Sequence, residues 1–188
     1  MAKIALKGFA DLSYFPVSAD TASAYSAGER VQLPGAQSCS PQDNRNSYEI
    51  VADDALYDRG SDYKSTTLAI KVAEMELSSL ADMLGSAYDA ETGTLYEGAA
   101  DNCAEVALTF SALRSDGGKR MFRYYNARLI AYKAEHRTRG DGGEIASYEL
   151  TFSCAGRLCD GRVRATRDTL SVPTQEELAF LATVDALE

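Results

Sequence analysis

Apolar and polar residues alternate with a period of two over much of the chain, which is the pattern of β-strands. Three segments show it clearly, 65–75, 105–113 and 147–154. In each segment one face is apolar and the other is small or polar, as expected for antiparallel strands that bury one face. The residues on the predicted buried faces are Thr66, Leu68, Ile70 and Val72, then Val106, Leu108, Phe110 and Ala112, then Tyr148, Leu150, Phe152 and Cys154.

The segment 119–135 is longer and has apolar residues on both faces. One face carries Phe122, Tyr124, Ile130 and Tyr132, and the other carries Met121, Tyr125 and Leu129. We expect such a strand to contact something besides its own core, either a second sheet or a neighbouring subunit. The Asp-Gly-Gly sequence at 116–118 predicts a tight hairpin before it, and the charged stretch 137–144 predicts a longer turn after it.

Two short stretches have helical spacing instead. The stretch 74–85 repeats leucine at helical intervals and ends at Gly85, a residue suited to the left-handed cap position. Near the C-terminus, Thr174 and Glu177 form the sequence pattern of a capping box after Pro173. Both helices are expected to be short and to lie on a sheet.

The polar stretches 18–30 and 38–47 are expected to form extended loops or the edges of long hairpins. Together the elements predict a mainly β fold, an antiparallel β-sandwich or partly open barrel with one flanking short helix and a C-terminal helix. The 188 residues, with 45% hydrophobic and 25% charged side chains, fit one soluble domain over residues 1–188.

The charge balance narrows the classes of partner. The chain carries 28 acidic and 19 basic residues, a net charge of −9, which disfavours binding to nucleic acid and to anionic membranes. No apolar run approaches the roughly 20 residues that span a bilayer. The N-terminal stretch 1–15 lacks the features of a signal peptide, so we expect the protein to fold in a cytoplasm and to have no membrane partner.

Four cysteines are present, Cys39, Cys103, Cys154 and Cys159. In a cytoplasm they are expected to be free thiols. Cys154 and Cys159 are too far apart for a redox pair, and a zinc site would need a second pair of ligands. We therefore predict no metal site.

The stretch 49–60 raises the question of chemistry, because Asp53 and Asp54 are adjacent and Asp58 follows. The acids could form a general acid–base pair or hold a hard cation, but they lack the ligand spacing of a calcium loop. We interpret the pair as a turn between two strands, since aspartate side chains bond readily to nearby backbone amides. His136, the only histidine, is interpreted as a solvated loop residue. No catalytic, cofactor-binding or metal-binding residue is predicted, and the chain is not expected to be an enzyme.

A series of short motifs resembles the major tail protein family of long-tailed bacteriophages, in its phi13-type branch. The likeness covers about residues 3–115, and the hairpin 104–133 is of the same kind as in the family. The basic stretch 157–167 has no clear counterpart in it. The matching marks are Lys7–Gly8, Leu33–Pro34–Gly35–Ala36, Ala52–Asp53–Asp54 with Leu56–Tyr57, Leu84–Gly85, and Tyr88–Asp89 with Thr92–Gly93.

The resemblance implies a tail tube subunit that catalyses nothing. Such proteins assemble as six-membered rings stacked into a tube around a tape-measure protein, and they meet tail terminator and baseplate proteins. DNA passes through the lumen without specific binding. The protein would be made in the host cytoplasm and located in the virion, and the turn at 52–58 would lie near an element that contacts neighbouring subunits.

Two other functions stay open on the sequence. A β-sandwich binding module, of adhesin or carbohydrate-binding type, could use the eleven tyrosines, although the chain has no tryptophan. A small hydrolase could use Asp53 or Asp54. Replacing both by asparagine separates these functions, because an enzyme would lose activity with its fold intact, whereas a tube protein would show faulty assembly.

Overall fold

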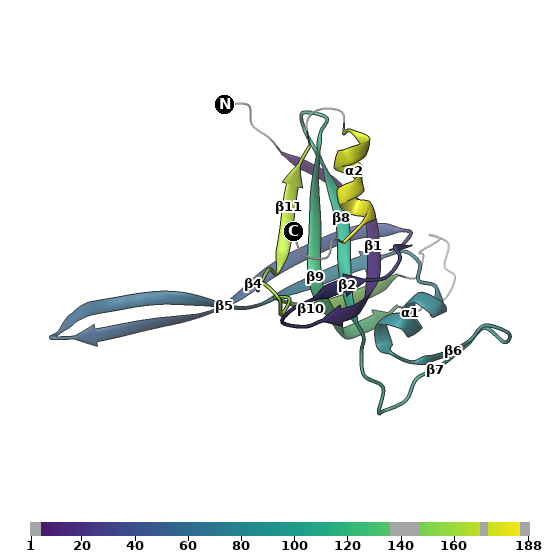
Figure 1. The fold of residues 1–188 in the computed structure, drawn as a ribbon, viewed down its shortest axis with the longest axis horizontal. Coiled ribbons are helices and arrows are strands. Elements are labelled where there is room, and N and C mark those ends of the chain that lie inside the picture. The colour runs from purple at the N-terminus through teal and green to yellow at the C-terminus, as the bar shows by residue number, and fades with distance from the viewer. Residues whose placement is uncertain (1–4, 136–146, 170–172, 185–188) are drawn as a thin grey trace, which may run out of the picture.

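The computed structural model describes residues 5–135, 147–169 and 173–184. Within these ranges the chain forms one nine-stranded antiparallel sheet and a separate two-stranded hairpin (Figure 1). The strands of the large sheet are β1 (Leu6–Asp20), β2 (Tyr25–Ala27), β3 (Val31–Gln32), β4 (Ala36–Ala52), β5 (Ala55–Val72), β8 (Glu105–Arg114), β9 (Lys119–Ala134), β10 (Tyr148–Ala155) and β11 (Arg164–Asp168). The small hairpin pairs β6 (Ala87–Asp89) with β7 (Thr94–Tyr96), and the helices are α1 (Leu77–Leu84) and α2 (Gln175–Ala182).

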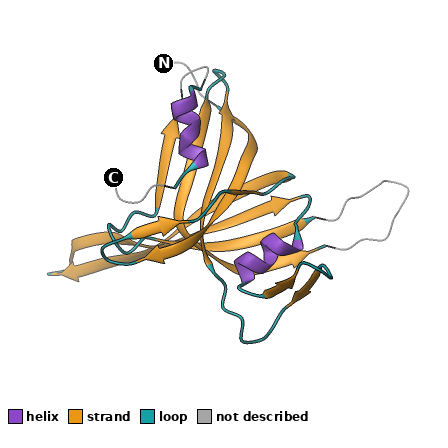
Figure 2. Cartoon of the chain, turned by 45° about the vertical axis from the view of Figure 1, so that its right-hand side comes forward, coloured by secondary structure: helices purple, strands orange, loops and turns teal. Residues whose placement is uncertain are grey.

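The large sheet curls without closing. Its strand order is β2-β1-β8-β9-β10-β5-β4, with β11 beside the first half of β9 and β3 beside β1. Strands β1 and β4 also contact each other although they are not paired, so the sheet bends back on itself. The prediction of a mainly antiparallel β fold is confirmed as an open, curved sheet with α1 at one flank and the C-terminal α2 at another (Figure 2).

The main hydrophobic core lies inside the curl. The predicted alternation is confirmed on β5 and β10, where Leu68, Ile70, Leu150 and Phe152 are fully buried. Met83 of α1 joins the same cluster. Because each such side chain contributes about 1.5–3 kcal/mol when it is withdrawn from water, this cluster is the main source of stability.

Strand β8 is buried on both faces. Its alternate residues Ala107, Thr109 and Ser111 are small or polar, as predicted, but they too are inaccessible to solvent. Thr109 lies under α2, and its hydroxyl donates a hydrogen bond to the Leu181 carbonyl at 3.2 Å. The Ser111 hydroxyl instead donates to the Asp11 carboxylate at 2.5 Å. Beside this contact lies a second, smaller cluster made by Phe15, Tyr25, Ala107, Tyr125 and Val184.

Two β-bulges explain the mixed pattern of β9. The register shifts by one residue between Tyr124 and Ala127 opposite β8, and again at Ile130 opposite β10. Each shift reverses which alternate residues face inward. Tyr124, then Ala127 and Leu129, and then Tyr132 therefore all reach the main core. The prediction of a long strand is confirmed, and its second face is covered partly by the smaller cluster of the same chain.

The predicted ends of the elements are also confirmed. Gly85 ends α1 with a φ of 68°, and Thr174 caps α2 in a capping box with Glu177. The hairpin before β9 turns at Gly117, which has a φ of 90°.

The predicted turn at 137–144 and His136 lie outside the described residues. Each of the two helices has eight residues, and no helix in the described ranges is long and apolar enough to cross a membrane.

Candidate functional site

The outer part of the β4–β5 hairpin, residues 45–62, projects from the rest of the molecule and is called the arm below (Figure 1). Apart from the half-buried Ala52 and Gly60, every residue of the arm is exposed. The polar stretch 38–47, predicted to be an extended loop or the edge of a long hairpin, is part of β4, and β4 lies at the end of the strand order. Strand β10 pairs with β5 only from Thr66 onward, so the arm presents two faces and two unpaired strand edges to its surroundings.

Asp53 and Asp54 form the two-residue turn at the tip of the arm. The flanking residues Ala52 and Ala55 are paired, and the two aspartates have φ values of 51° and 58°. Positive φ at both central positions is the pattern of a type I′ turn, which matches the twist of the strands that it joins. Aspartate tolerates this left-handed conformation better than most residues, so the interpretation of the pair as a turn is confirmed.

Large apolar side chains surround this acidic turn. Val51 and Leu56 are paired across the hairpin and are 69% and 53% exposed, and Tyr57 is 77% exposed. The register shifts at Tyr57, so this residue is the extra one of a β-bulge. Exposed apolar groups gathered at the end of a projecting hairpin are typical of a surface that meets another protein.

Tyr48 and Gly60 stiffen the middle of the arm. The two residues are directly paired, and a Cβ atom on Gly60 would come within 2.5 Å of the Tyr48 ring. The ring therefore lies against the glycine backbone, an arrangement that only glycine permits here. The Tyr48 ring therefore shields the backbone at Gly60 from water, in a two-stranded ribbon that no second sheet covers.

The base of the arm is held by Asp43 of β4. Its carboxylate accepts two hydrogen bonds from the Arg164 guanidinium, both at 3.0 Å, and one from the Thr66 hydroxyl at 2.7 Å. The bond from Thr66 and then the contact with Arg164 lower the pKa of Asp43 below its usual value. This cluster joins β4, β5 and β11, and it sets the position of the arm relative to β11.

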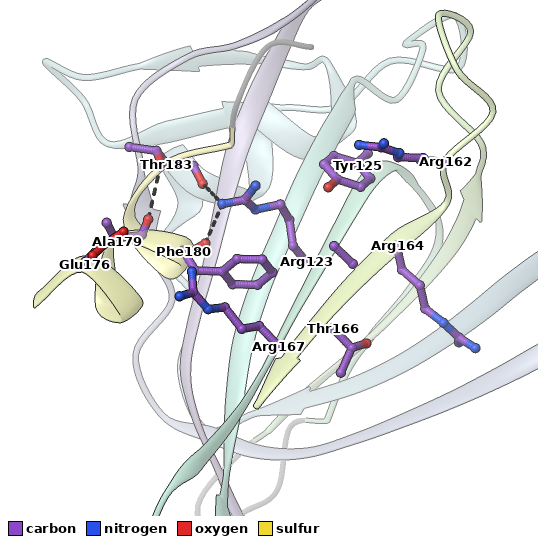
Figure 3. Close-up of a pocket in the computed structure, with 11 residues that line it drawn as sticks. Arg123, Tyr125, Arg162, Arg164, Thr166, Arg167, Glu176, Ala179, Phe180 and Thr183 are labelled. Atoms are coloured by element: carbon purple, nitrogen blue, oxygen red, sulfur yellow. Dashed lines mark hydrogen bonds between the residues drawn. The ribbon is translucent and has the colours of Figure 1, made fainter. Parts of the chain in front are cut away.

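A groove of about 710 Å³ lies between β11 and α2 (Figure 3). Its charged lining residues are four arginines and one acid, namely Arg123, Arg162, Arg164, Arg167 and Glu176. Figure 3 shows Arg123 pointing toward α2 and Arg164 pointing away from it, toward the base of the arm. The groove also has apolar surface, which Ala165, Ala179 and Phe180 supply.

Arg123 forms the floor of this groove and anchors α2. It is 5% exposed, and one of its terminal nitrogens donates to the carbonyl oxygens of Phe180 and Thr183 at 2.8 and 2.6 Å. Its guanidinium also lies 4.2 Å from the centre of the Phe180 ring. A cation at the carboxyl end of a helix is stabilised by the helix dipole, so Arg123 has a structural task there.

The basic stretch 157–167 divides into residues with different tasks. Arg157 is buried between the rings of Tyr25 and Tyr125, and it binds Asp160 through two hydrogen bonds of 2.8 and 2.7 Å. This pairing holds the pKa of Asp160 well below its usual range. Arg164 serves the arm base, whereas Arg162, with a side chain that is 52% exposed, and the exposed Arg167 face the groove.

The residues considered for chemistry are not brought together. Asp53 and Asp54 lie at an exposed turn, and Asp58 has its nearest polar contact 3.5 Å away at the Tyr48 hydroxyl. The four cysteines are free, and among the described residues no three histidine, cysteine or acidic side chains gather as a metal site would require. The arm and the groove are therefore the features to which a function can be assigned.

Sequence reasoning placed the turn but missed the groove. The only signal for the groove was the run of arginines at 157–167 in an otherwise acidic chain, and that run did not reveal which of them would face solvent. The tyrosines do not form one surface, since Tyr14, Tyr25, Tyr124 and Tyr125 are buried and the most exposed, Tyr57 and Tyr96, lie on different hairpins.

No protein-family model matches the chain, and no curated protein matches it significantly. Among solved structures it is similar to a chain of the sheath–tube complex of an extracellular contractile injection system, PVC, in the extended state, with 12% identity and a TM-score of 0.48 over 85% of this chain and 89% of that one. It is also similar to a chain of the tube-terminating cap of the anti-feeding prophage, with 10% identity and a TM-score of 0.48. The match covers 85% of this chain and 89% of that one. A chain of the baseplate of the same particle gives 10% identity and a TM-score of 0.42. That match covers 91% of this chain and 99% of the other. Likenesses at this level carry no conclusion about function, and the phi13-type resemblance stays a prediction.

Proposed function

We propose that this chain is a structural subunit of a phage-type tail tube, which assembles with copies of itself into stacked hexameric rings. The rings would form the conduit through which DNA enters the host. The observation that carries the proposal is the arm, a projecting hairpin with exposed apolar residues at its tip. The order of motifs that resembles the phage tail protein family supports the same function.

Unpaired strand edges fit a subunit that completes its sheet with neighbours. Within the described ranges β4 ends the strand order, and β11 has β9 on one side only. An exposed strand edge offers unpaired amides and carbonyls, which can pair with a strand of another molecule. Rings closed by such pairing would hide these edges, which in a lone copy are open to unwanted association.

The partners follow from the same proposal. A tube of this kind would enclose a tape-measure protein and end at a terminator and at a baseplate. It would be made in the host cytoplasm, become part of the virion and need no cofactor. The whole chain, residues 1–188, would act as one tube domain without catalytic activity.

The test removes the arm. In the first variant Ser47–Ser61 are replaced by Asn-Gly, a sequence suited to a type I′ turn, so that Asn46 and Asp62 stay paired. In the second, Asp53→Asn with Asp54→Asn removes two charges and keeps residues that tolerate positive φ. Negative-stain microscopy and sedimentation velocity of the concentrated protein should show rods or rings for the unchanged chain. The arm-less variant should stay monomeric, and the asparagine variant should assemble poorly.

Circular dichroism of both variants serves as the control for folding. Rods formed equally well without the arm would contradict the assignment of the arm, and a wild-type protein that stays monomeric at high concentration would contradict the tube. A catalytic use of the aspartates would instead appear as an activity lost in the asparagine variant. The binding-module alternative gains no support from the tyrosines, because they are divided between the core and separate hairpins.

A further inference from the structure

The tip of the arm and the groove beside α2 have opposite charge. Residues 49–59 of the tip contain four acids and one arginine, whereas the charged lining of the groove has four arginines and one acid. In a chain with a net charge of −9, a cluster of arginines on one surface is unusual and needs a reason. Opposed potentials on two surfaces of one molecule are the pattern expected when copies of that molecule bind one another.

The arm cannot reach the groove of its own copy. Asp43, at the base of the arm, is bound to Arg164, which lines the edge of the groove. Asp53 follows Asp43 by ten positions, nine of them in the continuous strand β4, and a rise of about 3.3 Å per residue puts the tip about 33 Å from that edge. Folding back would break the β4–β5 pairing. The tip therefore cannot fill the groove of its own copy, and a groove that it fills belongs to another molecule.

The apolar parts of the two surfaces also match. The tip exposes Leu56 and Tyr57, and the groove offers the Phe180 ring together with the small side chains of Ala165 and Ala179. A tyrosine ring can also stack on a guanidinium group, a contact that arginine makes more readily than lysine. Tyr57, as the extra residue of a bulge, is directed out of the ordinary strand alternation.

We infer that the groove between β11 and α2 is the docking site for the acidic arm tip of a second copy of this chain, an inference that rests on the proposed self-assembly. Asp53, Asp54 and Asp58 would meet Arg162 and Arg167, and Leu56 and Tyr57 would cover Phe180. The arginine-rich stretch then has a use in assembly. Each copy gives an arm to one neighbour and accepts an arm from another.

The charges in the groove fit a short acidic turn better than a nucleic acid. Arg123 donates to carbonyl groups at the end of α2, and Arg164 donates to Asp43. The exposed Arg162 lies 3.3 Å from the Asp160 carboxylate, which it shares with Arg157, so Arg167 and part of the charge of Arg162 are left for a ligand. Two such arginines suit a turn with two or three carboxylates. A duplex that is held by its phosphates usually needs more cationic contacts, and the net negative field of the chain opposes it.

The test reverses each surface by the same amount of charge. The groove variant is Arg162→Glu with Arg167→Glu, and the tip variant is Asp53→Asn, Asp54→Asn and Asp58→Lys. Each should raise the protein concentration needed for assembly by about tenfold or more. A 1:1 mixture of the two variants should recover assembly, because every arm then finds a groove of opposite charge. The matched controls change charge equally on other exposed residues and should assemble normally. They are Lys7→Glu with Lys64→Glu, and Glu29→Lys with Glu91→Lys.

A second measurement does not depend on tube formation. A photoreactive phenylalanine analogue in place of Tyr57, in the full-length chain, should cross-link to residues 162–169 or 173–183 of another copy, as identified by mass spectrometry. Tubes with cross-links elsewhere, or a groove variant that assembles like wild type, would overturn the docking and leave the proposed function standing. Oligomers that show the expected cross-link but form no tubes would support the docking and contradict the proposed tube function. A protein that stays monomeric and forms no cross-links at high concentration would contradict both the docking and the tube function.

The same variants decide between an arm and a polyanion as the occupant. Retention of duplex DNA by the wild-type protein, lost in the groove variant and accompanied by unchanged assembly, would make the groove a phosphate site and overturn the inference. With an arm as the occupant, the groove variant changes assembly, and neither protein retains DNA.

Discussion

Single side chains in this protein take their properties from burial more than from their chemical type. Arg157 and Arg167 are close in sequence, yet Arg157 is 2% exposed between two tyrosine rings and Arg167 is open to solvent. A buried guanidinium needs partners that satisfy its charge and its donors. Asp160 and the rings of Tyr25 and Tyr125 supply them, so Arg157 maintains the second cluster whatever the groove binds.

Desolvation also shifts the pKa of two cysteines, the half-buried Cys39 and the fully buried Cys154. It raises the pKa of the Cys39 and Cys154 thiols to about 12. At pH 8 such a thiol carries on the order of a thousandfold less thiolate than an ordinary cysteine. We therefore expect both residues to resist iodoacetamide in the native protein and to react quickly in denaturant, as measured by mass spectrometry of labelled peptides.

The same pKa shift predicts a dependence on pH. Because the folded pKa of each thiol lies above its unfolded value near 9, the unfolded chain loses the proton first. The contribution of these thiols to stability should therefore be complete below pH 9 and decline as the pH rises toward 12. Equal labelling of Cys154 in native and denatured protein would contradict its burial.

The short elements follow local rules, and their ends show this most clearly. The capping box of α2 and the left-handed glycine that ends α1 lie where the residue types predict them. Element interiors depend more on distant partners. β9 could not be assigned one buried face from its sequence, because its two bulges are set by the registers of β8 and β10.

Gly85 and Gly93 allow a matched test of such an end. Their φ values are 68° and 67°, but a Cβ atom on Gly85 would lie 2.3 Å from the Asn102 carbonyl oxygen, whereas one on Gly93 would meet nothing within 4 Å. Gly93→Ala should cost about 1 kcal/mol of unfolding free energy through backbone strain alone. Gly85→Ala should cost at least about 2 kcal/mol, because the Asn102 backbone must also move.

Urea denaturation of both alanine variants measures this difference. The midpoint should fall further for Gly85→Ala than for Gly93→Ala at a similar slope. Equal losses for the two variants would mean that the segment around Asn102 yields without cost, and that the close approach to α1 does not contribute to stability.

At the scale of the whole molecule, the charge distribution joins the arm, the groove and the proposed conduit. Every copy adds a net charge of −9, and the groove gathers three of the exposed arginines, Arg162, Arg164 and Arg167. If the groove is filled by an arm, the surface left to solvent is mainly acidic. An acidic wall repels phosphates and would let DNA slide past it.

The protein should accordingly not retain duplex DNA, even at low salt, where electrostatic attraction is strongest. An electrophoretic mobility assay with monomer and with assembled protein tests this, and a strongly basic protein of similar size provides the positive control. A clear shift of the DNA that added salt abolishes would count against a repelling lumen.

The sequence alone was sufficient for whatever depends on neighbours a few residues apart. The alternation on β5 and β10, the caps of both helices and the turn at Asp53–Asp54 were predicted from local residue types and are present. What only the tertiary structure decided depends on contacts between distant residues. The second buried face of β8, the length of the projecting arm and the tasks of the arginines at 157–167 belong to this group. Arg164 and Asp43 are 121 positions apart, and no local pattern reveals that folding brings such residues together. The physical reason is that burial and strand register are set by the partners that the folded chain provides.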